Sequence, residues 1–161
     1  MKIILLFLIV LCFGLIGYFY KQKLKDEKEA YLILKSYVEF LSANITLFKT
    51  NLAEINNNYI IMQKNKNAKS YKLIYKSTNN HVINPVIFEK LIQNKNDYFV
   101  IKNFFENLGK NEYEFEKESI KEFEKFVDLR LKNQEFLIKN KGDLTFKIML
   151  AIGAIVAILL W

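Results

Sequence analysis

Three kinds of side chain in this sequence are able to do chemistry: one histidine, one cysteine and a run of glutamates. His81 lies in a polar stretch without Cys, Asp or Glu at the spacing of metal ligands, so we interpret it as exposed and inactive. The glutamates alternate, and a step of two places successive members about 200° apart on a helix. We therefore expect a solvated face rather than an acid/base pair at Glu112, Glu114, Glu116 and Glu118.

The cysteine and the glycines also lack a catalytic setting. Cys12 is the only cysteine, which excludes an intramolecular disulfide, and Leu11 precedes it where lipoprotein processing needs a small residue. Phosphate loops, nucleophile elbows and dinucleotide fingerprints are not matched by the glycines, which stand at positions 14, 17, 109, 142 and 153. We predict a protein that is not an enzyme, without catalytic, cofactor-binding or metal-binding residues.

The first apolar end of the chain predicts a membrane anchor over residues 1–20. Ile3 to Tyr20 is 18 residues long, about 27 Å as a helix, and closes on the aromatic edge of Tyr18, Phe19 and Tyr20. A cleavable signal peptide is the alternative. No small-x-small site follows the run, however, and lysines come at once at positions 21, 23, 25 and 28.

The second apolar end predicts a shorter anchor over residues 144–161. Ile148 to Trp161 spans only about 21 Å as a helix, and extension back to Leu144 gives 18 residues if Lys147 snorkels toward the headgroups. Trp161 would then mark the far interface. A helix buried against the domain, or one lying in the membrane interface, is the alternative.

Charge predicts the orientation and the kinds of partner. Lysines and an arginine flank the inner ends of both anchors, which places residues 21–143 in the cytoplasm and both termini on the other side of the cell membrane. Residues 21–82 carry a net charge of +6 and residues 112–135 a net charge of −3. The basic half favours anionic lipid headgroups or an acidic partner. Nucleic acid is not expected, because the lysines are scattered and no binding motif accompanies them.

A single helix of about 32 residues is predicted between Tyr31 and Met62, where apolar residues recur at alternate steps of three and four. The members of this stripe are Tyr31, Leu34, Val38, Leu41, Ile45, Phe48, Leu52, Ile55, Tyr59 and Met62. Further apolar positions widen it beyond a two-stranded seam, so we expect it to pack against several helices. A homodimeric coiled coil is the alternative.

Three further helices are predicted after a solvated connector over residues 63–84. Pro85 begins a short helix with its apolar side at Val86, Ile87, Phe88, Leu91 and Ile92. Asp97 caps a third helix that carries Phe99, Val100, Ile101, Phe104, Phe105 and Leu108 and ends at Gly109 in a left-handed cap. A fourth runs from about Asn111 to Lys141, with Ile120, Phe123, Val127, Leu131 and Ile138 inside. The prediction is an all-α chain, with a cytoplasmic helical bundle of about four helices over residues 21–143 between two transmembrane helices.

The order of these features resembles the stage III sporulation protein AB family of endospore-forming bacteria, over nearly the whole length. The matching positions are Gly17, Leu24, Leu41, Ile45, Thr50, Leu52, the Phe105-x-x-Leu108-Gly109 motif, Ile120 and the tail from Lys147 through Gly153 to Trp161. The chain departs from the family pattern at four positions. Asn44 replaces an acidic residue, and Asn51 replaces the proline of a Thr-Pro-Leu turn. Glu112 and Glu116 replace aspartate and glutamine.

The resemblance implies a protein of the mother-cell membrane around the forespore, within the channel or secretion-like complex that joins the two cells. It also implies a helical domain similar to the cytoplasmic domain of the type II secretion platform protein, with the cytoplasmic ATPase of the complex as partner. We expect a docking platform whose binding patches lie on the first and fourth helices. The alternatives are a membrane-bound coiled-coil spacer in another envelope process such as division, with self-association, and a small membrane enzyme or transport subunit.

Overall fold

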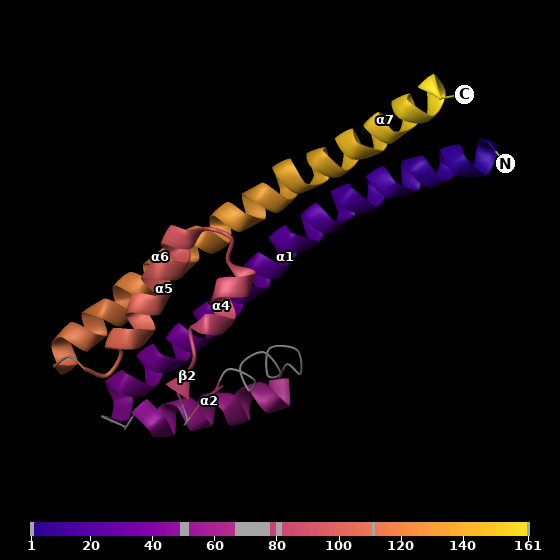
Figure 1. Ribbon diagram of the computed structural model, residues 1–161. Coiled ribbons are helices and arrows are strands. Elements are labelled where there is room, and N and C mark those ends of the chain that lie inside the picture. Colours follow the sequence, from indigo (N-terminus) through magenta and orange to yellow (C-terminus); the bar gives the residue numbers. More distant parts are fainter. Residues whose placement is uncertain (1, 49–51, 67–77, 80–81, 111, 161) are drawn as a thin grey trace. The chain divides into compact units, whose positions relative to one another are not determined.

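The computed structural model describes residues 2–48, 52–66, 78–79, 82–110 and 112–160 (Figure 1). Its elements are α1 (Lys2–Phe48), α2 (Leu52–Lys66), β1 (Thr78–Asn79), β2 (Val82–Ile83), α4 (Val86–Leu91), α5 (Lys95–Asn107), α6 (Tyr113–Leu137), the π-helix η1 (Ile138–Gly142) and α7 (Asp143–Leu159). The two short strands pair antiparallel. Apart from this small ladder the described structure is helical, which confirms the all-α prediction.

The helices belong to two compact units. We call Glu29–Arg130 the central unit, and Met1–Lys28 together with Leu131–Trp161 the anchor unit. Helix α1 contributes to both units without a break, and α6 does the same. The predicted first anchor and the start of the predicted first soluble helix are therefore parts of one continuous helix.

The prediction of one helix from Tyr31 to Met62 is wrong, because α1 ends at Phe48 and α2 begins at Leu52. The two helices pack on each other. The Tyr37 hydroxyl donates to Asn56 Oδ1 at 2.6 Å, and the Tyr59 hydroxyl donates to the Ile33 carbonyl at 3.3 Å. Folding back lets the two halves of one apolar stripe bury each other, which a straight helix cannot do within one chain.

The short helix α4 starts where proline predicts it. Pro85 stands directly before the helix, and the Asn84 side chain accepts a hydrogen bond from the Val86 backbone N–H at 3.0 Å. Phe88 and Ile92 are buried as predicted, but Val86 is half exposed, because α4 buries only one narrow side.

Helix α5 begins earlier than predicted and has a different cap. Asn94 is the capping residue, since its side chain accepts from the Asn96 backbone N–H at 3.0 Å. Asp97 is buried in the first turn and does not cap the helix. The predicted left-handed end is confirmed, because Gly109 has a φ of 80°.

Helix α6 confirms the predicted inner side of the fourth helix, since Ile120, Phe123, Val127 and Leu131 are buried. The predicted end at Lys141 is wrong. The α-helix ends at Leu137, passes through the wider turn η1 and continues as α7, so the helical run does not stop before the second apolar segment. Ile138 lies at the start of η1 and is only partly buried.

The anchor unit is an antiparallel pair formed by α1 and α7, whose outer ends lie together (Figure 1). Its backbones approach closely at glycines. A Cβ atom added to Gly17 would lie 2.9 Å from Phe146 Cα, and one added to Gly153 would lie 3.2 Å from Val10 Cα. Ile4–Asn44 and Tyr113–Leu159 each hold a window long and apolar enough to cross a membrane.

Candidate docking surface

The predicted glutamate face is correct for three residues and wrong for one. Glu112, Glu114 and Glu118 are exposed. Glu116 is buried, and its Oε1 accepts a hydrogen bond from the Gly109 N–H at 2.9 Å. The left-handed turn at Gly109 leaves a backbone donor that needs an acceptor, and the first turn of α6 supplies one. Glu116 is therefore part of the fold rather than of a solvated face.

The other candidates for chemistry yield no site within the part of the chain that the structure describes. His81 and Trp161 lie outside the described residues. Cys12 is a free, exposed cysteine in the apolar part of α1. Among the described residues, no group of three or more His, Cys, Asp or Glu side chains is placed to hold a metal ion. We therefore consider next the surface hollows to which another molecule could bind.

A groove of about 280 Å³ lies between α5 and α6 in the central unit. Its floor is aromatic, since the rings of Phe104 and Phe123 stack with centroids 3.8 Å apart and planes 5° apart. Its rim mixes apolar and polar side chains, namely Val100, Asn103, Asn107, Ser119, Glu122 and Phe126. An apolar floor with a few polar groups is the usual composition of a binding surface. We call this feature the α5–α6 groove.

A chain of aromatic contacts connects the groove floor to α1 and α2. The ring centroids of Tyr59 and Tyr37 are 5.1 Å apart, those of Tyr37 and Phe105 are 5.6 Å apart, and those of Phe105 and Phe104 are 5.6 Å apart. Burial raises the pKa of Tyr37 far above its ordinary value and that of Tyr59 to about 12. Both tyrosines stay neutral at physiological pH and act as hydrogen-bond donors inside the core.

A buried carboxylate fixes one edge of the groove. Asp97 accepts a hydrogen bond from the Tyr31 hydroxyl at 2.9 Å and pairs with Arg130 Nη2 at 2.7 Å. The Arg130 guanidinium lies 5.3 Å from the centroid of the Phe126 ring. Since Phe126 lines the groove, Asp97 positions a groove residue through Arg130. These contacts join residues far apart in the sequence, and no local pattern at Asp97 signals them.

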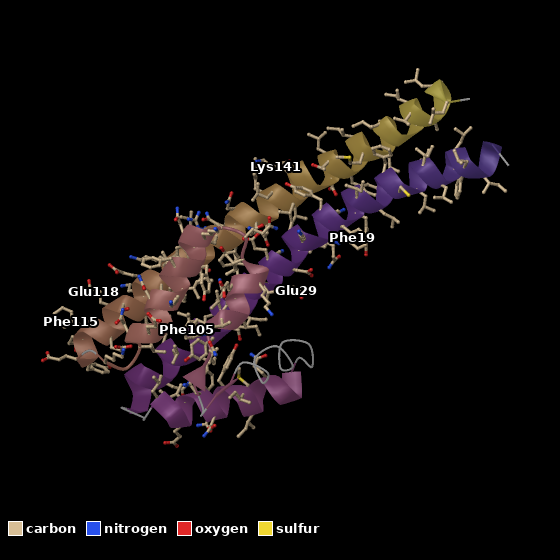
Figure 2. All side chains as sticks on the ribbon, viewed as in Figure 1. Phe19, Glu29, Phe105, Phe115, Glu118 and Lys141 are labelled. Atoms are coloured by element: carbon tan, nitrogen blue, oxygen red, sulfur yellow. The ribbon has the colours of Figure 1, made fainter. Side chains whose placement is uncertain are left out.

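A second hollow, of about 390 Å³, surrounds an exposed ring at the start of α6. Phe115 is 67% exposed, and Figure 2 shows it beside Glu118 at this end of the helix. The other lining residues are Glu114, Lys117 and Lys121. The hollow lies on the surface of one helix and has no aromatic floor, so we regard the α5–α6 groove as the better candidate.

The docking patches predicted on the first and fourth helices stay a prediction, and the hollows lie on only one of these two helices. Helix α6, the predicted fourth helix, lines both hollows, whereas α1 exposes Leu32 but lines neither. Helix α5 was not among the helices predicted to bear a patch, although Phe99 and Val100 on it are 61% and 41% exposed. A signal was available, since six apolar residues in ten cover more than one face of a helix.

Comparison with known proteins identifies the family. The sequence model of stage III sporulation protein AB matches residues 2–161, essentially the whole chain. The chain belongs to the stage III sporulation protein AB family. The resemblance inferred from the Phe105-x-x-Leu108-Gly109 motif and the anchors is thereby confirmed, and membership in this family makes the chain a stage III sporulation protein. No curated protein and no solved structure matches it significantly.

Proposed function

We propose that this protein is a non-enzymatic, membrane-anchored platform of the complex that links mother cell and forespore. Its central unit docks the cytoplasmic ATPase of that complex and other members through the α5–α6 groove. The family supports a role in sporulation, and the two apolar helical segments support membrane attachment. The observation that carries the docking role is the open groove between α5 and α6, whose floor is the buried stack of Phe104 on Phe123.

The charges around the groove indicate the chemistry of the partner. Glu122 lies in the rim and Glu118 is exposed one turn earlier on α6. Residues 112–135 carry a net charge of −3. An apolar segment with basic residues at its edges would complement this surface, because the floor buries apolar side chains and the rim attracts cations.

The coiled-coil spacer is the weaker reading. Its seam was expected to run through Leu41, Phe48 and Ile55. Leu41 and Ile55 are fully buried inside the central unit, so their side chains are not accessible to a second chain without unfolding. The predicted likeness to the type II secretion platform domain stays a prediction.

We also propose that the central unit lies in the cytoplasm of the mother cell, with both termini across the membrane that surrounds the forespore. The lysines at the inner ends of both anchors support this orientation. Single cysteines at the exposed positions Leu32 and Leu129, in a Cys12→Ala background, test it. They should react with an impermeant thiol reagent only after cell lysis. Reaction in intact cells would refute the orientation.

The docking role is tested with a matched pair of substitutions. Val100→Glu places a charge in the α5–α6 groove, whereas Val86→Glu places the same charge on α4, outside the groove, at a residue of similar exposure. Full-length protein is purified from sporulating cells and the recovered channel components are quantified. We expect the amount of ATPase recovered with Val100→Glu to fall at least tenfold, while Val86→Glu recovers as much as the unchanged protein.

The outcomes distinguish the alternatives. Equal recovery with both variants would refute docking at the groove. Recovery of only the protein itself, with parallel self-crosslinking, would favour the spacer. Failure of the unchanged protein to recover any channel component would count against the platform function as a whole.

A further inference from the structure

Five lysines without an ion-pair partner among the described residues gather where the charged and apolar parts of the anchor unit meet. All five are exposed. They come from α1, η1 and α7, and we call them the border lysines: Lys23, Lys25, Lys139, Lys141 and Lys147. Figure 2 labels Lys141 on this stretch. Exposed aromatic and aliphatic side chains, such as Phe19 and Leu144, lie near these lysines in the sequence. They mark the edge of the apolar part of the unit.

The acidic groups of this stretch are already engaged inside the unit. Lys21 Nζ lies 2.5 Å from Asp143 Oδ1, and Lys28 Nζ lies 2.8 Å from Glu135 Oε1. Asp26 accepts a hydrogen bond from Gln22, and Glu27 is buried. Residues 21–28 and 131–147 together hold eight lysines and four acidic residues, a net charge of +4. This stretch therefore keeps a net positive charge, to which the border lysines contribute.

Close packing of α1 against η1 and the start of α7 brings Lys25 and Lys147 near one acidic group, Asp143. A Cβ atom on Gly142 would lie 3.4 Å from Lys21 Cγ and 3.5 Å from a Leu24 methyl group. Lys25 follows Lys21 by four residues, and Lys147 follows Asp143 by four, so each lies on the same helix face as a member of that ion pair. The Lys21 hydrogen bond, helped by the charges of Lys147 and Lys25, lowers the pKa of Asp143 below its ordinary value.

We propose that the border lysines, which lie on more than one face of the anchor unit, bind the headgroup phosphates of anionic phospholipids around it. Ammonium groups donate charge-assisted hydrogen bonds to phosphate oxygens. Phe19 and Leu144, which are exposed beside the lysines, offer contact for the glycerol and upper acyl chains. This apolar contact favours a lipid over free phosphate. Basic clusters directly cytoplasmic of membrane helices are suited to such headgroups. The site rests on the membrane placement proposed above.

The test uses the full chain reconstituted in vesicles of phosphatidylcholine with a trace of spin-labelled phosphatidylglycerol or spin-labelled phosphatidylcholine. The test variant is Lys25→Gln/Lys141→Gln/Lys147→Gln. The matched control is Lys117→Gln/Lys121→Gln/Lys125→Gln, which removes the same charge from exposed positions of α6 in the central unit. The measured quantity is the fraction of each labelled lipid immobilised by the protein.

We expect the unchanged protein and the control to immobilise phosphatidylglycerol in preference to phosphatidylcholine. In the test variant this preference should fall about fivefold for each lysine removed. The corresponding Lys→Arg variant should restore it, because the charge returns. Equal immobilisation of both lipids by the unchanged protein, or full preference in the test variant, would overturn the site.

Two further arms separate the remaining explanations. Millimolar inorganic phosphate, added at constant ionic strength, should leave the preference unchanged; its loss would show a free-phosphate site and overturn the lipid assignment. Carbonate extraction of each preparation reports whether the anchors are inserted. An extractable protein would refute the membrane placement itself, whereas an inserted protein without lipid preference refutes only the headgroup site.

Discussion

The central unit and the anchor unit are both made of packed helices. Contacts between large side chains hold the first together, whereas close approach of backbones holds the second. In the central unit, large side chains meet in a continuous aromatic core that also contains buried polar groups such as Asp97 and Asn56. In the anchor unit, backbones approach each other where side chains are missing, at Gly17 and Gly153. Water drives the burial of large apolar groups, whereas close contact at small residues is the packing typical of membrane helices. The same chain therefore follows two packing rules.

The largest expected effect lies in the polar part of the central core. Asp97→Ala removes the acceptor of the Tyr31 hydroxyl and leaves Arg130 without its carboxylate. Because Asp97 is buried and Arg130 is partly covered, we expect a loss of about 3 kcal/mol in the free energy of unfolding. Thermal unfolding of the full chain in detergent, followed by circular dichroism, measures it.

The control for this prediction is Asp128→Ala, which breaks a 2.6 Å pair with Lys35 that is open to solvent. Solvent screens exposed pairs, so we expect a much smaller loss of stability here than for Asp97→Ala. Equal losses in the two variants would contradict the view that buried polar contacts, rather than surface charges, define the central unit.

A smaller effect is expected from a single methyl group between the anchors. Gly17→Ala puts a Cβ atom 2.9 Å from the Phe146 Cα atom, so a backbone must move, at a cost of about 1–3 kcal/mol. Gly14→Ala is the matched control, because its Cβ atom would meet only the end of the Leu150 side chain, at 3.1 Å.

Spin labels at Lys25→Cys and Lys139→Cys, in a Cys12→Ala background, report the separation of the two helices. Gly17→Ala should shift the distance distribution to longer values and broaden it. The two helices should also separate at a lower fraction of denaturing detergent. The Gly14→Ala distribution should match that of the parent. If both glycines tolerate alanine equally, close backbone contact does not hold the anchor unit.

The smallest effect concerns alkaline pH and should be confined to the central unit. The pKa values of Tyr37 and Tyr59 are raised by burial, so the stability that depends on their neutral forms is complete below about pH 10. It is lost as the pH rises toward the folded-state values. At pH 11 we expect a loss of about 1 kcal/mol per tyrosine.

Phenolate absorbance measured together with helical circular dichroism tests this prediction. The two signals of the central unit should change in one transition, because these hydroxyls ionise only when the core opens. Tyr37→Phe/Tyr59→Phe should reduce the alkaline loss and leave the acid side unchanged. Ionisation of both tyrosines in a fully helical protein would contradict the burial argument.

The fold could be predicted from the sequence wherever a helix has one long, regular apolar side. This holds for the inner side of α6, and it holds for the left-handed end at Gly109, which has a local chemical cause. The break between α1 and α2 could not be predicted from periodicity, because the residues of a stripe keep the same spacing whether it is straight or folded back. The resemblance to the family, which implied a Thr-Pro-Leu turn where this chain has Asn51, was a local hint.

The candidate site was harder to predict, since it depends on contacts between distant segments. Glu116 was assigned to the solvent because its neighbours at 112, 114 and 118 are exposed, and only the position of the Gly109 N–H reveals its role. Val100 and Phe104 lie on one apolar helix, yet only the stack of Phe104 on Phe123 decides which of them forms a floor. The helix α6, which lines the groove, could be predicted from the sequence, whereas the groove itself could not.

The π-helical turn η1 has a consequence for the rotation of α7 about its own axis. In η1 the Asp143 N–H reaches the Ile138 carbonyl five residues back, so the turn holds one residue more than an α-helical turn. Upstream, Leu131 and Gln134 are buried, and downstream Gly142, Phe146 and Gly153 face α1. If the same residues were wound as a plain α-helix, everything beyond them would be turned by about 100°, and Gly153 would point away from Val10. The extra residue thus sets the rotation of α7 about its axis, and with it the direction in which the glycine face points.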